Sequence, residues 1–104
     1  MGNFDTQMHF VGILGALQSK GIPVKGVKGE NSKMNFELET QRGSIKTTLV
    51  EWPGSLVQVS CKSDYDDIMV VTIPMKGSKD AIASLVESFW KAVCRAVSYT
   101  HLRA

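Results

Sequence analysis

Residues 34–39 read MNFELE, and apolar and polar side chains alternate through this whole run. A period of two is typical of a strand with one buried face and one solvated face. The same period continues outward through residues 44–52 and 57–62, with the turn residues Pro53 and Gly54 between them. Because parallel neighbours would need crossovers of a dozen or more residues, these short connections predict antiparallel pairing.

Two further segments extend the predicted sheet. Residues 68–75, IMVVTIPM, are apolar at both odd-numbered and even-numbered positions, which favours a strand covered on both faces. We expect this strand to be central, or to lie between a helix and a partner. Residues 24–28 add an edge strand, so that the prediction is a meander of four to five strands.

One helix is expected before the predicted strands in the sequence, and another after them. Asp5 or Thr6 can cap a first helix over residues 5–20, which Gly21 ends, and Ser78 can cap the last helix. Glycines at 12 and 15 are expected to let the first helix approach a sheet or a second chain closely. The last helix carries apolar residues at helical spacing: Ile82, Leu85, Val86, Phe89, Trp90 and Val93. The predicted fold class is α+β, with an N-terminal helix, an antiparallel meander and a C-terminal amphipathic helix packed on the sheet.

Length and composition limit the classes of protein to consider. The 104 residues, 43% of them hydrophobic and 21% charged, suit one globular domain. The net charge of +2 is too small to support nucleic-acid binding. The sequence has neither a long apolar run nor a signal-peptide pattern, so we expect no membrane association and a cytoplasmic location, the host cytoplasm if the source is viral. Cys61 and Cys94 lie far apart and are expected to be buried free thiols, with no metal site and no cofactor.

The last eight residues, VSYTHLRA at 97–104, resemble one reading frame of a transposase adapter used to prepare sequencing libraries. This resemblance implies that residues 97–104 are a translated adapter tail from an assembled environmental DNA fragment, and that residues 1–96 are a single native α+β domain. Without Arg103, the 12 basic residues become 11 against 10 acidic ones, so that the native segment is nearly neutral.

The residues that could carry catalysis are few. His9 is the only histidine outside the tail, and no pattern places it beside a serine or cysteine nucleophile. Residues 64–67, DYDD, could hold a divalent cation, but they lack the glycine and the final glutamate of a calcium loop. We therefore expect a solvated turn there, and a protein that is not an enzyme.

Four residues are candidates for ligand binding. Lys25 and Lys28 flank glycines in the run KGVKG, where backbone N–H groups and ammonium groups could contact an anion. Trp52 and Tyr65 could stack on a planar ligand. The competing interpretations are a glycine-rich edge strand for the lysines and core or rim packing for Trp52.

Two functions follow as hypotheses. The first is a small anti-defence protein from environmental DNA, such as phage DNA, that sequesters a nucleotide-derived immune signal and binds no other cofactor. The second is a dimeric module that binds a partner polypeptide, because the order helix, meander, helix resembles small chaperone and adaptor domains at the level of architecture. Both hypotheses are compatible with a homo-oligomer.

Overall fold

The computed structural model describes residues 2–41 and 43–103, with side chains described for residues 5–41 and 43–95. Helix α1 (Gly2–Ser19) precedes five strands, and helix α2 (Lys79–Arg103) follows them. The strands are β1 (Val24–Glu30), β2 (Lys33–Thr40), β3 (Gly43–Trp52), β4 (Leu56–Ser63) and β5 (Ile68–Pro74).

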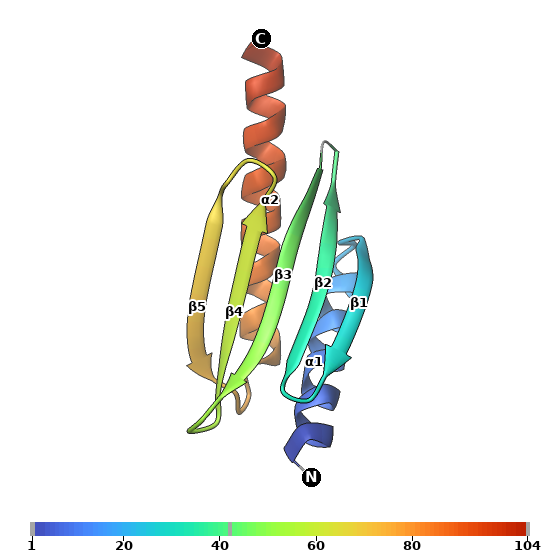
Figure 1. Ribbon diagram of the computed structural model, residues 1–104. Coiled ribbons are helices and arrows are strands. Elements are labelled where there is room, and N and C mark those ends of the chain that lie inside the picture. The colour runs from blue at the N-terminus through green and yellow to red at the C-terminus, as the bar shows by residue number, and fades with distance from the viewer. Residues whose placement is uncertain (1, 42, 104) are drawn as a thin grey trace.

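The five strands form one antiparallel meander in the order β1-β2-β3-β4-β5. Figure 1 shows both helices on the same side of this sheet, which leaves the opposite side uncovered. The predicted α+β class and its element order are confirmed, and the predicted edge strand at residues 24–28 is β1. We call the uncovered side the open face and the other side the helix face.

The hydrophobic core lies between the helix face and the two helices. Strand residues at alternate positions point into it, for example Phe36, Leu38, Leu49 and Val59, which are almost completely buried. Phe10, Ile13 and Leu17 of α1 meet these residues from the other side. The period-two and period-3.6 patterns therefore identify the two surfaces that bury each other.

Helix α2 begins directly after Ser78, as predicted. The hydroxyl of Ser78 donates to the carbonyl of Met75 at 2.6 Å, and the Ile82 N–H donates to the Ser78 carbonyl at 2.8 Å. Ile82, Val86 and Val93 of the predicted stripe are buried, and Phe89 and Trp90 pack partly buried against the core. The last turns of α2 project beyond the sheet (Figure 1). The adapter origin of residues 97–104 stays a prediction, and Ala104 lies outside the described residues.

The predicted start of α1 is wrong. The helix begins at Gly2, so Asp5 lies in its first turn and Thr6 is inside it. Thr6 is buried and donates its hydroxyl to Glu51 Oε1 at 2.7 Å. A tertiary hydrogen bond therefore uses the side chain that the sequence pattern predicted as a cap. The predicted end is confirmed, because Gly21 follows the helix with φ at +83°.

Of the two positions predicted for residues 68–75, the central one is wrong, and the one between a helix and a partner stays a prediction. β5 is an edge strand that pairs with β4 alone, and Ile68 and Val70 are 63% and 55% exposed. In a meander each short connection places the next strand beside the previous one, so the last strand must lie at an edge. Its doubly apolar sequence therefore does not reflect burial within this chain.

The glycines of α1 differ from one another. A Cβ on Gly12 would lie 3.1 Å from Lys79 Cδ, so the close approach there is to α2 rather than to the sheet. A Cβ on Gly15 would meet nothing within 4 Å. Neither helix, over the described residues, has the length and apolar content that crossing a membrane requires.

Candidate functional site

The open face consists of parallel rows of cross-strand neighbours. One row runs Lys25, Glu37, Lys46, Lys62 and Ile68 from β1 to β5. The adjacent row runs Lys28, Asn35, Thr48, Ser60 and Val70. These two rows make the open face polar and basic over β1 to β4 and apolar at β5.

Lys46 and Lys62 are direct neighbours on β3 and β4. Like charges opposite each other on adjacent strands destabilise a sheet. None of the ion pairs found among the described residues includes either lysine, although Glu37 lies opposite Lys46 on β2. Together with Lys28 in the next row, these two lysines form what we call the lysine platform.

A shallow depression of about 310 Å³ lies beside the lysine platform. Lys28 of β1 and Lys46 of β3 line it, together with Asn35 of β2 and Thr48 of β3. The Thr48 hydroxyl donates to Asn35 Oδ1 at 2.8 Å, which leaves the amide NH₂ of Asn35 available as a donor. Gly26 also lines the depression, at the bulge in β1 between Lys25 and Lys28. Glu37 lines it as well, beside Lys46. The arrangement can therefore offer ammonium, amide and hydroxyl groups to the anionic part of a ligand, and a carboxylate to its hydroxyl or amino groups.

The two predicted lysines have different surroundings. Lys28 borders the depression on the open face. Lys25 lies in the next row and forms an ion pair with Glu39 at 3.3 Å, with both side chains about half exposed. The glycine-rich run that contains them is an edge strand rather than a phosphate loop, although Gly26 has φ at +64°.

The structure does not bring Trp52 and Tyr65 together. Trp52 pairs with Leu56 at the start of β4, whereas Tyr65 follows Ser63 at the other end of the same strand. At about 3.3 Å per residue, about 20 Å separates these two ends. Trp52, 47% exposed, instead neighbours Leu56 and Pro74 in the last row of the open face, which we call the apolar corner.

The acidic turn at residues 64–67 is organised by Ser63. Its hydroxyl accepts hydrogen bonds from the N–H groups of Tyr65 and Asp67 at 3.0 and 3.1 Å. Asp64 Oδ2 accepts the N–H of Ser44 at 2.8 Å across the β2–β3 end of the sheet. These carboxylates stabilise the turn and its neighbouring strands, which fits the predicted solvated turn.

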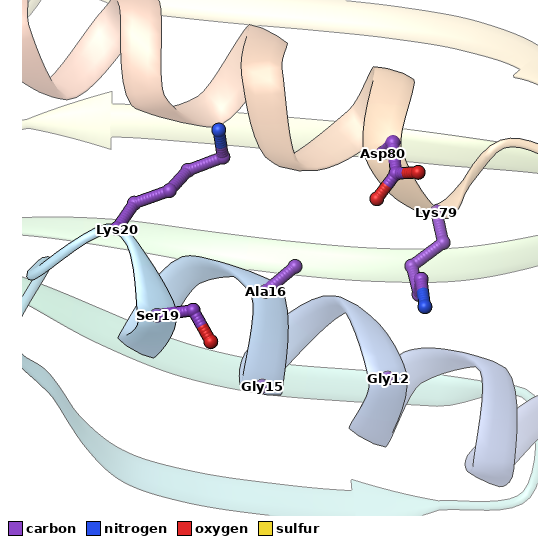
Figure 2. Close-up of a pocket in the computed structure, with 7 residues that line it drawn as sticks. All are labelled: Gly12, Gly15, Ala16, Ser19, Lys20, Lys79 and Asp80. Carbon is purple, nitrogen blue, oxygen red and sulfur yellow. The ribbon is translucent and has the colours of Figure 1, made fainter.

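Two other depressions lie away from the open face. Figure 2 shows the one between the helices, about 560 Å³, where Lys79 points toward Gly12 of α1 and Lys20 reaches toward α2. Lys20 is already paired with Glu87 at 3.3 Å. The other, about 400 Å³, is bordered by Trp90, whose indole N–H donates to the Glu39 carbonyl at 2.9 Å.

His9 and the cysteines lie apart from the lysine platform. The hydroxyl hydrogen of Ser78 is used by Met75, so His9 Nε2 must donate in its 3.0 Å contact with Ser78. Burial, and then the charge of Lys79, lower the pKa of His9. Burial raises the pKa of the Cys61 thiol to about 11, against a smaller opposing effect of its hydrogen bond with Thr47. Cys61 is a buried free thiol as predicted, whereas Cys94 is only half-buried.

Sequence reasoning missed Lys46 and Lys62. The signal was present, because Leu49 and Val59 must share the buried face and the register that pairs them also pairs Lys46 with Lys62. The loop at Pro53 and Gly54 determines this register. Comparison of the chain with family models, characterised proteins and solved structures gives no match in any of the three.

Proposed function

We propose that this protein is a non-catalytic binding protein whose open face binds an anionic, nucleotide-like small molecule. The observation that carries the proposal is the lysine platform, with Lys46 directly opposite Lys62. Their repulsion lowers the stability of the sheet, and an anion bound between them removes that penalty. This charge arrangement supports a role in binding rather than in folding.

The neighbouring polar groups favour a ligand with more than a phosphate. Asn35, Thr48 and Ser60 lie in the row beside the two lysines. Their amide and hydroxyl groups can donate to and accept from a sugar or a base edge while the ammonium groups contact phosphate oxygens. Nucleotide-derived immune signals, the ligands favoured by the sequence interpretation, belong to this chemical class.

The reactive groups described above support sequestration rather than turnover. Cys61 points to the helix face, where its raised pKa keeps the thiol protonated at neutral pH. His9 contacts Ser78 between the two helices, on the side of the sheet away from the lysine platform. A ligand on the open face therefore meets no activated nucleophile among these groups.

Thermal unfolding with a panel of cyclic dinucleotides, cyclic ADP-ribose isomers and mononucleotides tests the proposal. A ligand at a hundredfold excess over its Kd adds about 2.7 kcal/mol, which raises the Tm by on the order of 10 °C. We expect such a shift for the native protein with one class of the panel, and its loss in Lys46→Ala/Lys62→Ala. Lys91→Ala, which changes an exposed lysine of α2, is the matched control.

Two results would contradict the proposal. One is a Tm that no anionic compound of the panel moves. The other is an equal shift in the native protein and in Lys46→Ala/Lys62→Ala, which would place the ligand away from the lysine platform.

The apolar corner favours a second candidate function, a dimeric adaptor that binds a partner polypeptide. Trp52 and Pro74 are exposed there and Leu56 is half-buried. Exposed aromatic side chains are common anchors for polypeptides. If this function is the right one, Trp52→Ala abolishes the binding of a defined partner, and Lys46→Ala/Lys62→Ala leaves that binding unchanged.

A further inference from the structure

The backbone of β5 leaves one row of hydrogen-bonding groups unused. The Asp67 carbonyl accepts the Ser63 N–H at 2.9 Å, and the Met75 N–H donates to the Ser55 carbonyl at 2.8 Å. Odd-numbered residues from 67 to 75 therefore direct their backbone groups toward β4. Because the direction of these groups alternates along a strand, Ile68, Val70 and Thr72 direct their N–H and C=O groups outward, where the described part of the chain provides no further strand.

The side chains of this edge are apolar on both faces. Ile68 and Val70 are exposed on the open face. On the helix face Met69, Val71 and Ile73 are only half-buried, because α2 lies against β2 and β4 rather than β5. No residue from Ile68 to Pro74 is charged. An uncharged apolar edge with free backbone groups is a template for another strand.

Charges at the two ends of β5 indicate which strand fits. Asp64, Asp66 and Asp67 precede the strand, whereas Lys76, Lys79 and Asp80 follow it, so that the first end is acidic and the second has a net positive charge. A second β5 in antiparallel orientation places the acidic end of each copy beside the basic end of the other. A parallel arrangement would instead place the aspartates of the two copies together. The edge is therefore complementary to itself in one orientation.

We propose that β5 pairs antiparallel with β5 of a second copy of this chain, across a two-fold axis at Val70. This inference does not rest on the proposed ligand. Ile68 then lies opposite Thr72 of the second copy, and the three outward residues of each chain make about six hydrogen bonds across the axis. Met69 lies beside Val71 of the second copy, which extends the apolar contact on the helix face.

The symmetry determines the shape of the assembly. An axis perpendicular to the sheet keeps the helices of both copies on one side and joins the two five-stranded sheets into one. The open face becomes continuous across the axis, with one lysine platform on each side of it. The other edge strand, β1, stays at the outer rim.

The mass of the full chain in solution tests this pairing. Light scattering and sedimentation over a dilution series should give twice the 11.4 kDa of one chain. Val70→Lys places two lysines opposite each other at the axis and should give the mass of one chain. Val27→Lys changes the exposed valine of β1, 46% exposed against 55% for Val70, and should leave the dimer intact.

Thr72→Pro is a second variant that tests the pairing if Val70→Lys fails to fold. The Thr72 N–H points away from β4, so proline there costs the single chain no strand hydrogen bond. By symmetry the dimer loses two hydrogen bonds, and its dissociation constant should rise by about thirtyfold while the circular dichroism spectrum is unchanged. Lack of folding in Val70→Lys would leave Thr72→Pro as the deciding variant.

Cross-linking tests the register. In a Cys94→Ser background, Val70→Cys places two thiols opposite each other at about 5.5 Å between Cα atoms, within disulfide range. Copper phenanthroline should oxidise them to a disulfide-linked dimer, and Thr72→Cys, which faces Ile68, should remain uncross-linked. A native chain that stays monomeric at every concentration would overturn the proposal. Dimers that persist in both Val70→Lys and Thr72→Pro would do the same, as would a monomer that pairs only with an added foreign strand peptide.

Discussion

The two edges of the sheet differ in the features that control strand pairing. β1 carries Lys25, Lys28 and Glu30, is interrupted by a bulge, and has a single exposed apolar side chain, Val27. β5 has no charge and no bulge, and its side chains are apolar on both faces apart from Thr72. Pro74, which has no N–H to donate, restricts pairing only at the last position of the strand. Charges and bulges are the usual means by which edge strands avoid unwanted pairing.

This contrast gives a physical meaning to the doubly apolar segment at residues 68–74. If aggregation were the only selection on the sheet, both edges would carry charges. One protected edge and one unprotected edge instead suit a closed two-fold assembly, because each chain then has one surface that pairs and one that stops further growth.

Removing the protection of β1 should produce the largest effect. The variant Lys25→Val/Lys28→Val with Val27 deleted removes two charges and the extra residue of the bulge. Each chain would then present two edges capable of pairing, and a chain with two such edges forms open-ended assemblies. We expect light scattering to show polydisperse species larger than the dimer. A variant that elutes as the same discrete dimer would show that charge and bulge do not protect β1.

A change of pH should have a smaller effect. It should alter the stability of the helix layer, where His9 lies, and leave the pairing of the β5 edge unchanged. The lowered pKa of His9 means that the folded state disfavours the charged imidazole. The contribution of neutral His9 to the stability of the fold is therefore fully present above the unfolded-state pKa of 6.5. It is lost as the pH falls below that pKa. We expect the Tm to fall by on the order of a few degrees between about pH 7.5 and about pH 5.5.

His9→Gln is the matched variant for this pH test, because its amide can still donate to Ser78 without titrating in this range. It should flatten the dependence of the Tm on pH. The dimer dissociation constant should stay constant in both proteins, because His9 contacts Ser78 between the two helices and takes no part in the β5 pairing. A pH-dependent dissociation constant that survives in His9→Gln would contradict this separation.

Removing residues 97–104 should have the smallest effect. Val93 is the last buried residue of α2 among those whose side chains are described, and the last turns of this helix project beyond the sheet. We expect the shortened chain to keep its dimer and to unfold within about 2 °C of the full chain. A loss of folding on truncation would show that these residues belong to the domain and would contradict the adapter interpretation.

Most of the fold could be predicted because periodicity reports burial directly. The alternation at residues 34–39 and the helical stripe from Ile82 to Val93 each identified a buried surface correctly. β5 was misplaced because an apolar strand reads the same whether it is covered by its own chain or left for another. The start of α1 was misplaced because Thr6 bonds to Glu51, which is distant in the sequence.

The candidate site was harder to predict than the fold. Lys28 was singled out and does border the depression on the open face. Lys46 and Lys62 were not, because their juxtaposition depends on the strand register and not on local spacing. Trp52 and Tyr65 were both predicted as candidates for stacking on a planar ligand, yet they lie at opposite ends of β4. Without the strand register, the sequence does not show that Lys46 and Lys62 are neighbours or that Trp52 and Tyr65 lie far apart.

Amide hydrogen exchange at the two edges tests the central claim most directly. The amides of Ile68, Val70 and Thr72 should be protected in the native protein at high concentration and should exchange rapidly in Val70→Lys. The amide of Val24 provides the comparison at β1. The Pro23 carbonyl beside it accepts the Glu39 N–H, so the backbone N–H of Val24 points away from β2. It should exchange rapidly in both proteins. Rapid exchange of all three β5 amides in the native protein at every concentration would contradict the pairing of this edge.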